Sequence, residues 1–212
     1  MTVAQTDYPV RRTALMQINK SSSYRLLPVT DIGPRLSHCE LPWAGPRLLK
    51  NGRTLGRNGR FGRLEPVVRR TFDIVTMARL SVGPSWATMS QVQRQQVTDG
   101  FGRYISATYA ERFDSYSGQK LQVTDEQPAA AGTMVHSQIV KANGEPVKVD
   151  YLMRKNGDSW LIADVYLDGA ISEVATRRSE FAAILKNEGI DGLIAALNRK
   201  ANMLTSTTAK AF

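Results

Sequence analysis

Three aspartates and one histidine in the C-terminal half have the side chains best suited to acid–base chemistry. Asp164 and Asp168 have the same parity along a predicted strand, so both can project from one face, and Asp158 lies in the turn before it. A carboxylate pair can act as general acid and base. Turn and helix-cap roles are commoner for such residues, with Asp158 in a turn and Asp168 as a cap, and His136 lies within another predicted strand with no visible partner. We therefore expect structural roles and no catalytic residue.

Sites for metals, phosphates or a nucleophile find little support in the sequence. Cys39 follows His38, but adjacency along the chain does not make a catalytic dyad. The second histidine is His136, and no cluster of His, Cys or Asp residues has the spacing of metal ligands. The glycine-rich stretch 56–62 lacks the preceding strand that a phosphate-binding loop requires. No metal and no cofactor are expected.

Hydrophobic spacing predicts the helices that frame these residues. Segment 64–80 has apolar residues at helical spacing, with Pro66 near its start, where proline is tolerated. A long helix is predicted over 90–113, with its first residue as the N-cap. The helical period returns over 171–189, ends at a glycine, and is followed by a last helix over 191–204.

Between the helices the hydrophobic period changes to two, which predicts strands. The expected strands are 120–124, 133–142, 147–155 and 160–167, and Asn156-Gly157 is a strong hairpin signal. The fold class is therefore α+β, with one curved antiparallel sheet of about four strands covered by helices. Such a sheet either fills its concavity with side chains or leaves an apolar pocket for a lipid-like ligand.

Charge and composition narrow the class of protein. The 212 residues carry 28 Lys and Arg against 19 Asp and Glu, a net charge of +9. Residues 1–60 hold ten of the basic residues and three acidic ones, so the rest of the chain is nearly neutral. Nucleic-acid binding by the folded part therefore lacks electrostatic support. The longest uncharged runs, 80–93 and 127–140, are shorter than the ~20 apolar residues of a membrane-spanning helix.

Several motifs taken together resemble one family. They are VDYLMRKNGDSWLIADV (149–165), DGAIS (168–172), RRSEFAAIL (177–185) and GIDGL (189–193). The chain thus resembles the MlaC/toluene-tolerance family over about residues 47–203. The upstream motifs VGPSWATMS (82–90) and FDSYSG (113–118) resemble its branch associated with hopanoid biosynthesis.

This resemblance implies a lipid carrier without chemistry. Family members are periplasmic and enclose an apolar pocket between a curved sheet and helices. The implied cargo is a phospholipid or a hopanoid, shuttled between the outer and inner membranes. The implied partners are an inner-membrane ABC transporter complex with its MCE-domain subunit and an outer-membrane lipoprotein complex. A monomer is expected, with no nucleic acid bound.

The residues expected to line the pocket are predicted from their apolar character alone, and each of them could equally belong to an ordinary core. Four cations, Arg154, Lys155, Arg177 and Arg178, are candidates to meet anionic head groups or a partner, although a solvated face is the commoner role. The expected lining residues are Trp86, Phe101, Ile105, Tyr109, Val149, Tyr151, Met153, Ile162 and Ile171.

The sequence divides into a lipid-binding domain over 47–204, a C-terminal tail over 205–212 and an irregular head over 1–46. The head is rich in proline and serine, and it shows neither a secretory signal nor the first helix that the family resemblance implies. We expect a mispredicted start or a frameshift to account for it.

Two other function classes compete with the carrier. One is a small-molecule enzyme on a cone-shaped α+β fold, which requires a titratable pair within the cavity and gains support if Asp164 or His136 faces the pocket. The other is a nucleic-acid or scaffold protein that uses the basic head over 1–46.

Overall fold

The first described helices are α2 and α3, which are joined by a short break in which the backbone pairs with the sheet. The computed structural model describes residues 52–112 and 119–206, all within one compact unit, Ile32–Phe212. Helix α2 spans Gly52–Thr71, with a kink at Gly56, and helix α3 spans Ile74–Val82. The head over 1–46 and the tail from 207 onward lie outside the described residues.

The single helix predicted over 64–80 is wrong, because the chain breaks at Phe72 and Asp73. Phe72 forms a parallel β-bridge with Ile162 and is 2% exposed. The Asp73 side chain then accepts a hydrogen bond from the Thr76 amide at 3.1 Å and starts α3 as its N-cap. Pro66 consequently lies inside α2 and not near the start of a helix.

Helix α4, Gln91–Arg112, follows the short 3₁₀ helix η2, Gly83–Thr88. The predicted N-cap is confirmed: the Ser90 hydroxyl accepts from the Gln93 amide at 3.2 Å, and the Gln93 side chain accepts from the Ser90 amide at 3.1 Å. This reciprocal pair is a capping box, which satisfies two amides that have no partner inside the helix.

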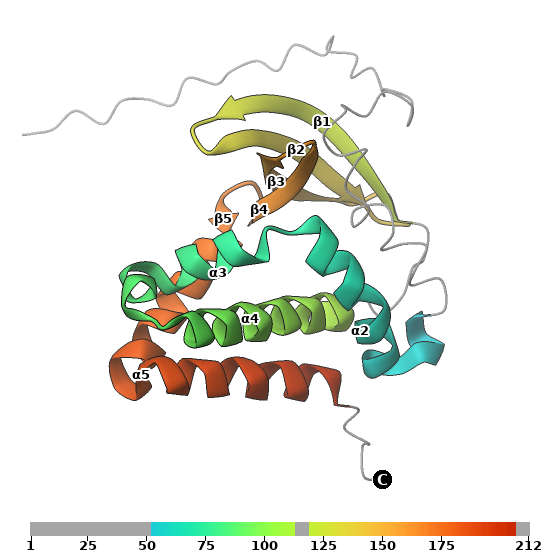
Figure 1. Ribbon diagram of the computed structural model, residues 1–212. Helices are drawn as coiled ribbons and strands as arrows, with labels where there is room; N and C mark the ends of the chain where they lie inside the picture. Colours follow the sequence, from blue (N-terminus) through green and yellow to red (C-terminus); the bar gives the residue numbers. More distant parts are fainter. Residues whose placement is uncertain (1–51, 113–118, 207–212) are drawn as a thin grey trace, which may run out of the picture. The chain divides into compact units, whose positions relative to one another are not determined.

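The sheet is antiparallel, and its strands follow one another in chain order (Figure 1). The strands are β1 (Lys120–Ala129), β2 (Gly132–Val140), β3 (Pro146–Asn156), β4 (Ser159–Leu167) and β5 (Ile171–Ser172). The α+β class and the antiparallel sheet are confirmed. The first strand is longer than the predicted 120–124, and a short fifth strand occupies the start of the segment that was predicted to be helical.

Helix α5, Glu173–Thr205, closes the fold and bends at Gly189, whose φ of 69° is a left-handed conformation that suits glycine. The two predicted C-terminal helices therefore exist as the two parts of this bent helix. Its N-cap is Ser172, whose hydroxyl accepts from the Ala175 amide at 2.9 Å. The expectation that Asp168 caps this helix is wrong, because Asp168 lies in the preceding turn with a φ of 51°.

The sheet and the helices share one hydrophobic core. Helices α3, α4 and α5 lie in layers on one side of the sheet (Figure 1). Alternate residues of β3, namely Val149, Tyr151 and Met153, are buried in the same cluster as Phe101 and Ile105 of α4. The strand period predicted for this segment is thus confirmed, and it fixes which face of the sheet meets the helices.

Candidate functional site

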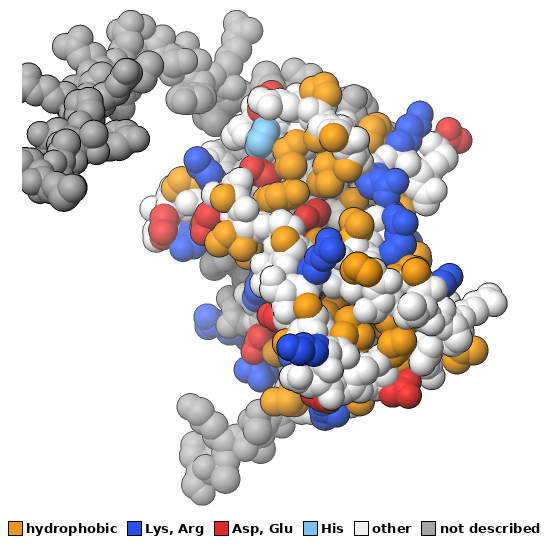
Figure 2. Space-filling view, turned by 90° about the vertical axis from the view of Figure 1, so that its left-hand side faces the viewer, with side chains coloured by type: hydrophobic (Ala, Val, Ile, Leu, Met, Phe, Trp, Pro, Cys, Tyr) orange, Lys and Arg blue, Asp and Glu red, His pale blue; other side chains and the backbone are white. Residues whose placement is uncertain are grey.

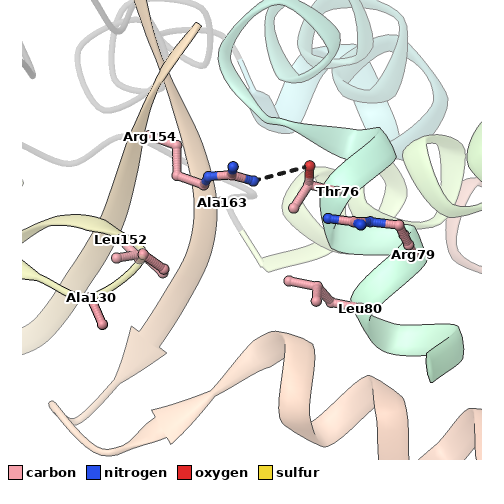
Figure 3. A pocket seen from close by; sticks show the side chains of 8 residues that line it. Thr76, Arg79, Leu80, Ala130, Leu152, Arg154 and Ala163 are labelled. Atoms are coloured by element: carbon pink, nitrogen blue, oxygen red, sulfur yellow. Dashed lines mark hydrogen bonds between the residues drawn. The ribbon is translucent and has the colours of Figure 1, made fainter. Parts of the chain in front are cut away.

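A cavity of about 340 Å³ lies between helix α3 and the sheet (Figure 3). Its size is at the lower end of that of small-molecule pockets. One wall is the α3 face, the other consists of β3 and β4, and the turn between β1 and β2 forms the end. The lining residues are Thr76, Arg79, Leu80, Ala130, Ala131, Leu152, Arg154 and Ala163.

The cavity combines an apolar interior with cationic side chains. Ala163 is 2% exposed, Leu152 is half-buried, and Leu80 is 43% exposed. The guanidinium groups of Arg79 and Arg154 point into the space from opposite walls (Figure 3). Figure 2 shows hydrophobic side chains gathered on one face of the molecule, with Lys and Arg side chains among them. Such a surface suits a ligand with one apolar and one anionic end.

The hairpin turn comes close to the cavity because β2 begins with a glycine. A Cβ atom on Gly132 would lie 2.1 Å from the carbonyl oxygen of Met153 on β3. Only glycine permits this approach of the two backbones, which brings Ala130 and Ala131 over Leu152. The small alanine side chains leave the space at this end of the cavity unfilled.

The nine residues expected to line a pocket lie elsewhere in the fold. Phe101, Ile105, Val149, Tyr151, Met153 and Ile162 are buried in the main hydrophobic cluster, each 7% exposed or less. Trp86 and Tyr109 are half-buried and pack against that cluster. Ile171 is 55% exposed on β5. None of the nine belongs to the residues that line the cavity.

Trp86 and Tyr109 already have neighbours that fix them. The guanidinium of Arg94 stacks over the Trp86 ring at 5.9 Å and donates to the Trp86 carbonyl at 3.1 Å. Tyr109 packs edge-on against Phe72, with 5.7 Å between ring centroids. Burial raises the pKa of the Tyr109 hydroxyl well above its ordinary value, and Tyr151 raises this pKa further.

Asp164 holds the start of α5 and does not face the cavity. One carboxylate oxygen accepts from the amides of Val165 at 2.8 Å and Val174 at 3.1 Å, and the other accepts from the Ser172 hydroxyl at 2.6 Å. Asp164 is 6% exposed. A carboxylate with these three donors has a structural role, which agrees with the general expectation for the three aspartates, although its contacts with the start of α5 were not predicted.

His136 has a partner that the sequence did not reveal. Its Nδ1 lies 2.9 Å from one carboxylate oxygen of Asp150, and the other oxygen accepts from the Ser137 amide at 3.1 Å. Asp150 thereby replaces part of the ladder between β2 and β3. Neither His136 nor Asp150 is among the residues that line this cavity, so the cavity gives the enzyme hypothesis no support.

The four cations proposed for head groups separate in the structure. Arg154 lines the cavity, whereas Lys155 and Arg178 are exposed elsewhere. Arg177 is 6% exposed, and its guanidinium pairs with Glu173 and Glu180 along α5. Burial opposes the charge of Arg177, but its carboxylate partners raise its pKa overall. Arg177 therefore braces the helix and is not available to a ligand.

Within residues 52–112 and 119–206, no group of three His, Cys, Asp or Glu residues is placed to hold a metal ion. In the same part of the chain, no helix combines the length and the apolar character needed to cross a membrane.

Comparison with known proteins places the chain in a family. The family model described as "MlaC protein" matches residues 47–199. The intermembrane phospholipid transport system binding protein MlaC of Haemophilus influenzae is 27% identical over 126 residues. That alignment covers 57% of this chain and 58% of the relative, so the match spans less than two thirds of the relative's length.

A solved structure shares the fold. The phospholipid-binding protein from Ralstonia solanacearum, determined in complex with a phospholipid, superimposes with a TM-score of 0.70. It is 22% identical, and the match covers 80% of this chain and 98% of that one. Neither relative's name is that of an enzyme. Because the family model matches most of the sequence, the chain belongs to the MlaC family.

Proposed function

We propose that this protein is a periplasmic phospholipid-binding carrier that moves its cargo without chemical change. The observation that carries the proposal is the cavity between α3 and the sheet, which joins Leu80, Leu152 and Ala163 to two guanidinium groups. Membership of the MlaC family and the phospholipid-related names of both relatives support it.

The energetics of such a carrier rest on burial of apolar carbon. Each methylene that leaves water contributes about 0.8 kcal/mol, so partial burial of two acyl chains is enough to hold a lipid outside a membrane. The cavity of about 340 Å³ accommodates only the polar end and the first carbons of such a molecule. To reach the core, the chains then have to extend beyond the cavity and around the strand edge, because Met153 points to the face of β3 opposite to Leu152 and Arg154.

For this reason the nine predicted lining residues remain part of the proposal. Met153 lies between Leu152 and Arg154 in the chain and points to the other face of β3, so the core lies across the sheet from the cavity wall. A lipid chain that separates α3 from the sheet replaces contacts between core residues by contacts with itself.

The proposal extends to cargo, partners and domain limits. Phospholipid is the leading cargo, and the hopanoid branch is a second possibility that rests on the motifs over 82–90 and 113–118 alone. We further propose residues 47–204 as the lipid-binding domain of a monomer. It would exchange cargo with an inner-membrane ABC transporter complex, through its MCE-domain subunit, and with an outer-membrane lipoprotein complex.

Native mass spectrometry of the purified full chain tests the proposal, together with solvent extraction of whatever co-purifies. We expect about one phospholipid per chain, and a hopanoid in the extract would reassign the cargo. Ala131→Trp, which fills the end of the cavity, should lower occupancy several-fold. Ala142→Trp is the matched control, because this exposed alanine lies in the turn at the opposite end of β2 and outside the cavity. A folded chain that contains no lipid and takes up none would refute the carrier function.

A further inference from the structure

The guanidinium groups of the two cavity arginines have fewer or weaker protein partners than that of the buried Arg60. The Arg79 side chain is exposed in the last turn of α3, and its guanidinium has no hydrogen bond or ion pair within the described residues. By contrast, buried Arg60 donates to the carbonyls of Ala110 at 2.7 Å and Gly52 at 2.9 Å. Arg79 therefore keeps all of its donors for a ligand.

Arg154 crosses the mouth of the cavity with weak contacts. From β3, its Nη1 lies 3.4 Å from the Thr76 hydroxyl and 3.7 Å from a carboxylate oxygen of Asp73, both at the start of α3 (Figure 3). The Arg154 side chain is 42% exposed. Long contacts between partly exposed groups contribute little, so an anion in the cavity can take over these donors.

The charge balance of the cavity favours an anion. Its eight lining residues include two arginines and no acidic residue. The nearby carboxylate of Asp73 lies outside the lining and is occupied as the N-cap of α3, where it accepts from the Thr76 amide at 3.1 Å. A planar guanidinium presents paired N–H donors that match the oxygens of a phosphate group.

From these observations we propose that Arg79 and Arg154 bind the phosphate of the lipid from opposite walls, so that the cavity prefers phospholipids with a net negative head group over zwitterionic ones. The inference rests on the proposed carrier function and adds a class of cargo to it. The phosphate is common to both lipid classes, but a zwitterionic head group brings its own ammonium close to two guanidinium groups. That repulsion is absent for phosphatidylglycerol.

The binding geometry follows from the two walls. The phosphate lies between α3 and β3, where Arg154 exchanges its contact with Asp73 for one with the phosphate. The glycerol and the first acyl carbons then lie against Leu80, Leu152 and Ala163. Exchange of a carboxylate partner for a phosphate also loosens one of the side-chain links between the sheet and the start of α3.

In the test, the full-length protein is incubated with vesicles of phosphatidylglycerol or of phosphatidylethanolamine that have identical acyl chains. Native mass spectrometry then counts the lipid bound per chain. We expect about tenfold more uptake of phosphatidylglycerol. Arg79→Gln and Arg154→Gln should each reduce that uptake several-fold and leave phosphatidylethanolamine nearly unchanged, and the double variant should abolish the preference. Lys148→Gln, an equal change of charge at an exposed site on β3, should have no effect.

A variant that is expected to raise lipid uptake tests whether Arg154 exchanges its contact with Asp73 for one with the phosphate. Asp73→Asn keeps a side-chain oxygen for the α3 N-cap but removes the negative charge beside Arg154, so it should raise phosphatidylglycerol uptake. Thermal melts of each variant check folding, and exposed Arg79 is the substitution that perturbs the structure least.

The outcomes separate this inference from the carrier function. Equal uptake of both lipids, unaltered by the arginine variants, would overturn the phosphate-binding role and leave the carrier function standing. No uptake of either lipid would overturn both. The last experiment uses inorganic phosphate alone. If phosphate binds below millimolar concentration, competes with lipid and loses this binding in Arg79→Gln, the site is one for free phosphate and the lipid assignment is wrong.

Discussion

Removal of the Asp164 side chain should lower the melting temperature of the protein without impairing lipid binding. The carboxylate is 6% exposed and accepts hydrogen bonds from the Val165 and Val174 amides and from the Ser172 hydroxyl, among its contacts. Asp164→Ala leaves two buried amides without this acceptor and removes the side-chain hydrogen bonds that link β4 to the start of α5.

The magnitude follows from these contacts. A hydrogen bond to a charged group contributes about 1.5–3 kcal/mol, and the three bonds share two oxygens, so their losses do not add. We expect Asp164→Ala to lower the free energy of unfolding by about 3 kcal/mol. For a chain of this size each kcal/mol corresponds to about 2–4 °C, so the melting temperature should fall by roughly 6–12 °C.

Circular dichroism melts and urea titrations measure this loss, and lipid occupancy is measured well below the new melting temperature. Asp158→Ala is the control, because Asp158 is an exposed turn residue whose removal should change stability by less than about 0.5 kcal/mol. Unchanged or increased stability of Asp164→Ala would refute the structural role. A substitution that increases stability is typical of a residue that serves function and lowers the stability of the native protein.

Four further substitutions have expected outcomes. Phe101→Ala removes a ring that is 0% exposed and should lower the free energy of unfolding in urea by about 3–5 kcal/mol. Ser90→Ala removes the α4 cap and should cost about 1 kcal/mol in the same titration. Gly132→Ala places a Cβ atom 2.1 Å from a carbonyl oxygen and should cost more than about 1 kcal/mol, measured by thermal melts. The pKa of Tyr166 is raised first by desolvation and then by the charge and hydrogen bond of Asp164, so Asp164→Asn should lower this pKa in an ultraviolet titration.

Elements with local signals were predictable from the sequence. Ser90 and Gln93 cap α4 through contacts three residues apart, and this information lies entirely within the segment. The bend at Gly189 and the hairpin turn at Asn156-Gly157 are equally local, because each depends on a backbone conformation that glycine adopts at little cost.

The division between α2 and α3 was missed because one of its causes lies far away in the chain, although the Asp73 N-cap is a local signal. Phe72 leaves the helical path to pair with Ile162, and the Asp73 amide donates to the Ile162 carbonyl at 2.9 Å. Nothing between residues 64 and 80 signals a partner some 90 positions later. The same limit applies to His136, whose partner Asp150 lies on the next strand.

The cavity was not predicted because hydrophobic patterning points to large apolar side chains, and those residues fill space. The interior of a protein is close-packed, and Phe101, Met153 and Ile162 are buried in one hydrophobic cluster. Space remains where side chains are small, and Ala130, Ala131 and Ala163 bound the cavity on the side of the sheet. A run of alanines at a hairpin turn was the available sequence signal, but it identifies a cavity only once Gly132 is known to press that turn against β3. The lining is therefore determined by the approach of two backbones, which no hydrophobic pattern encodes.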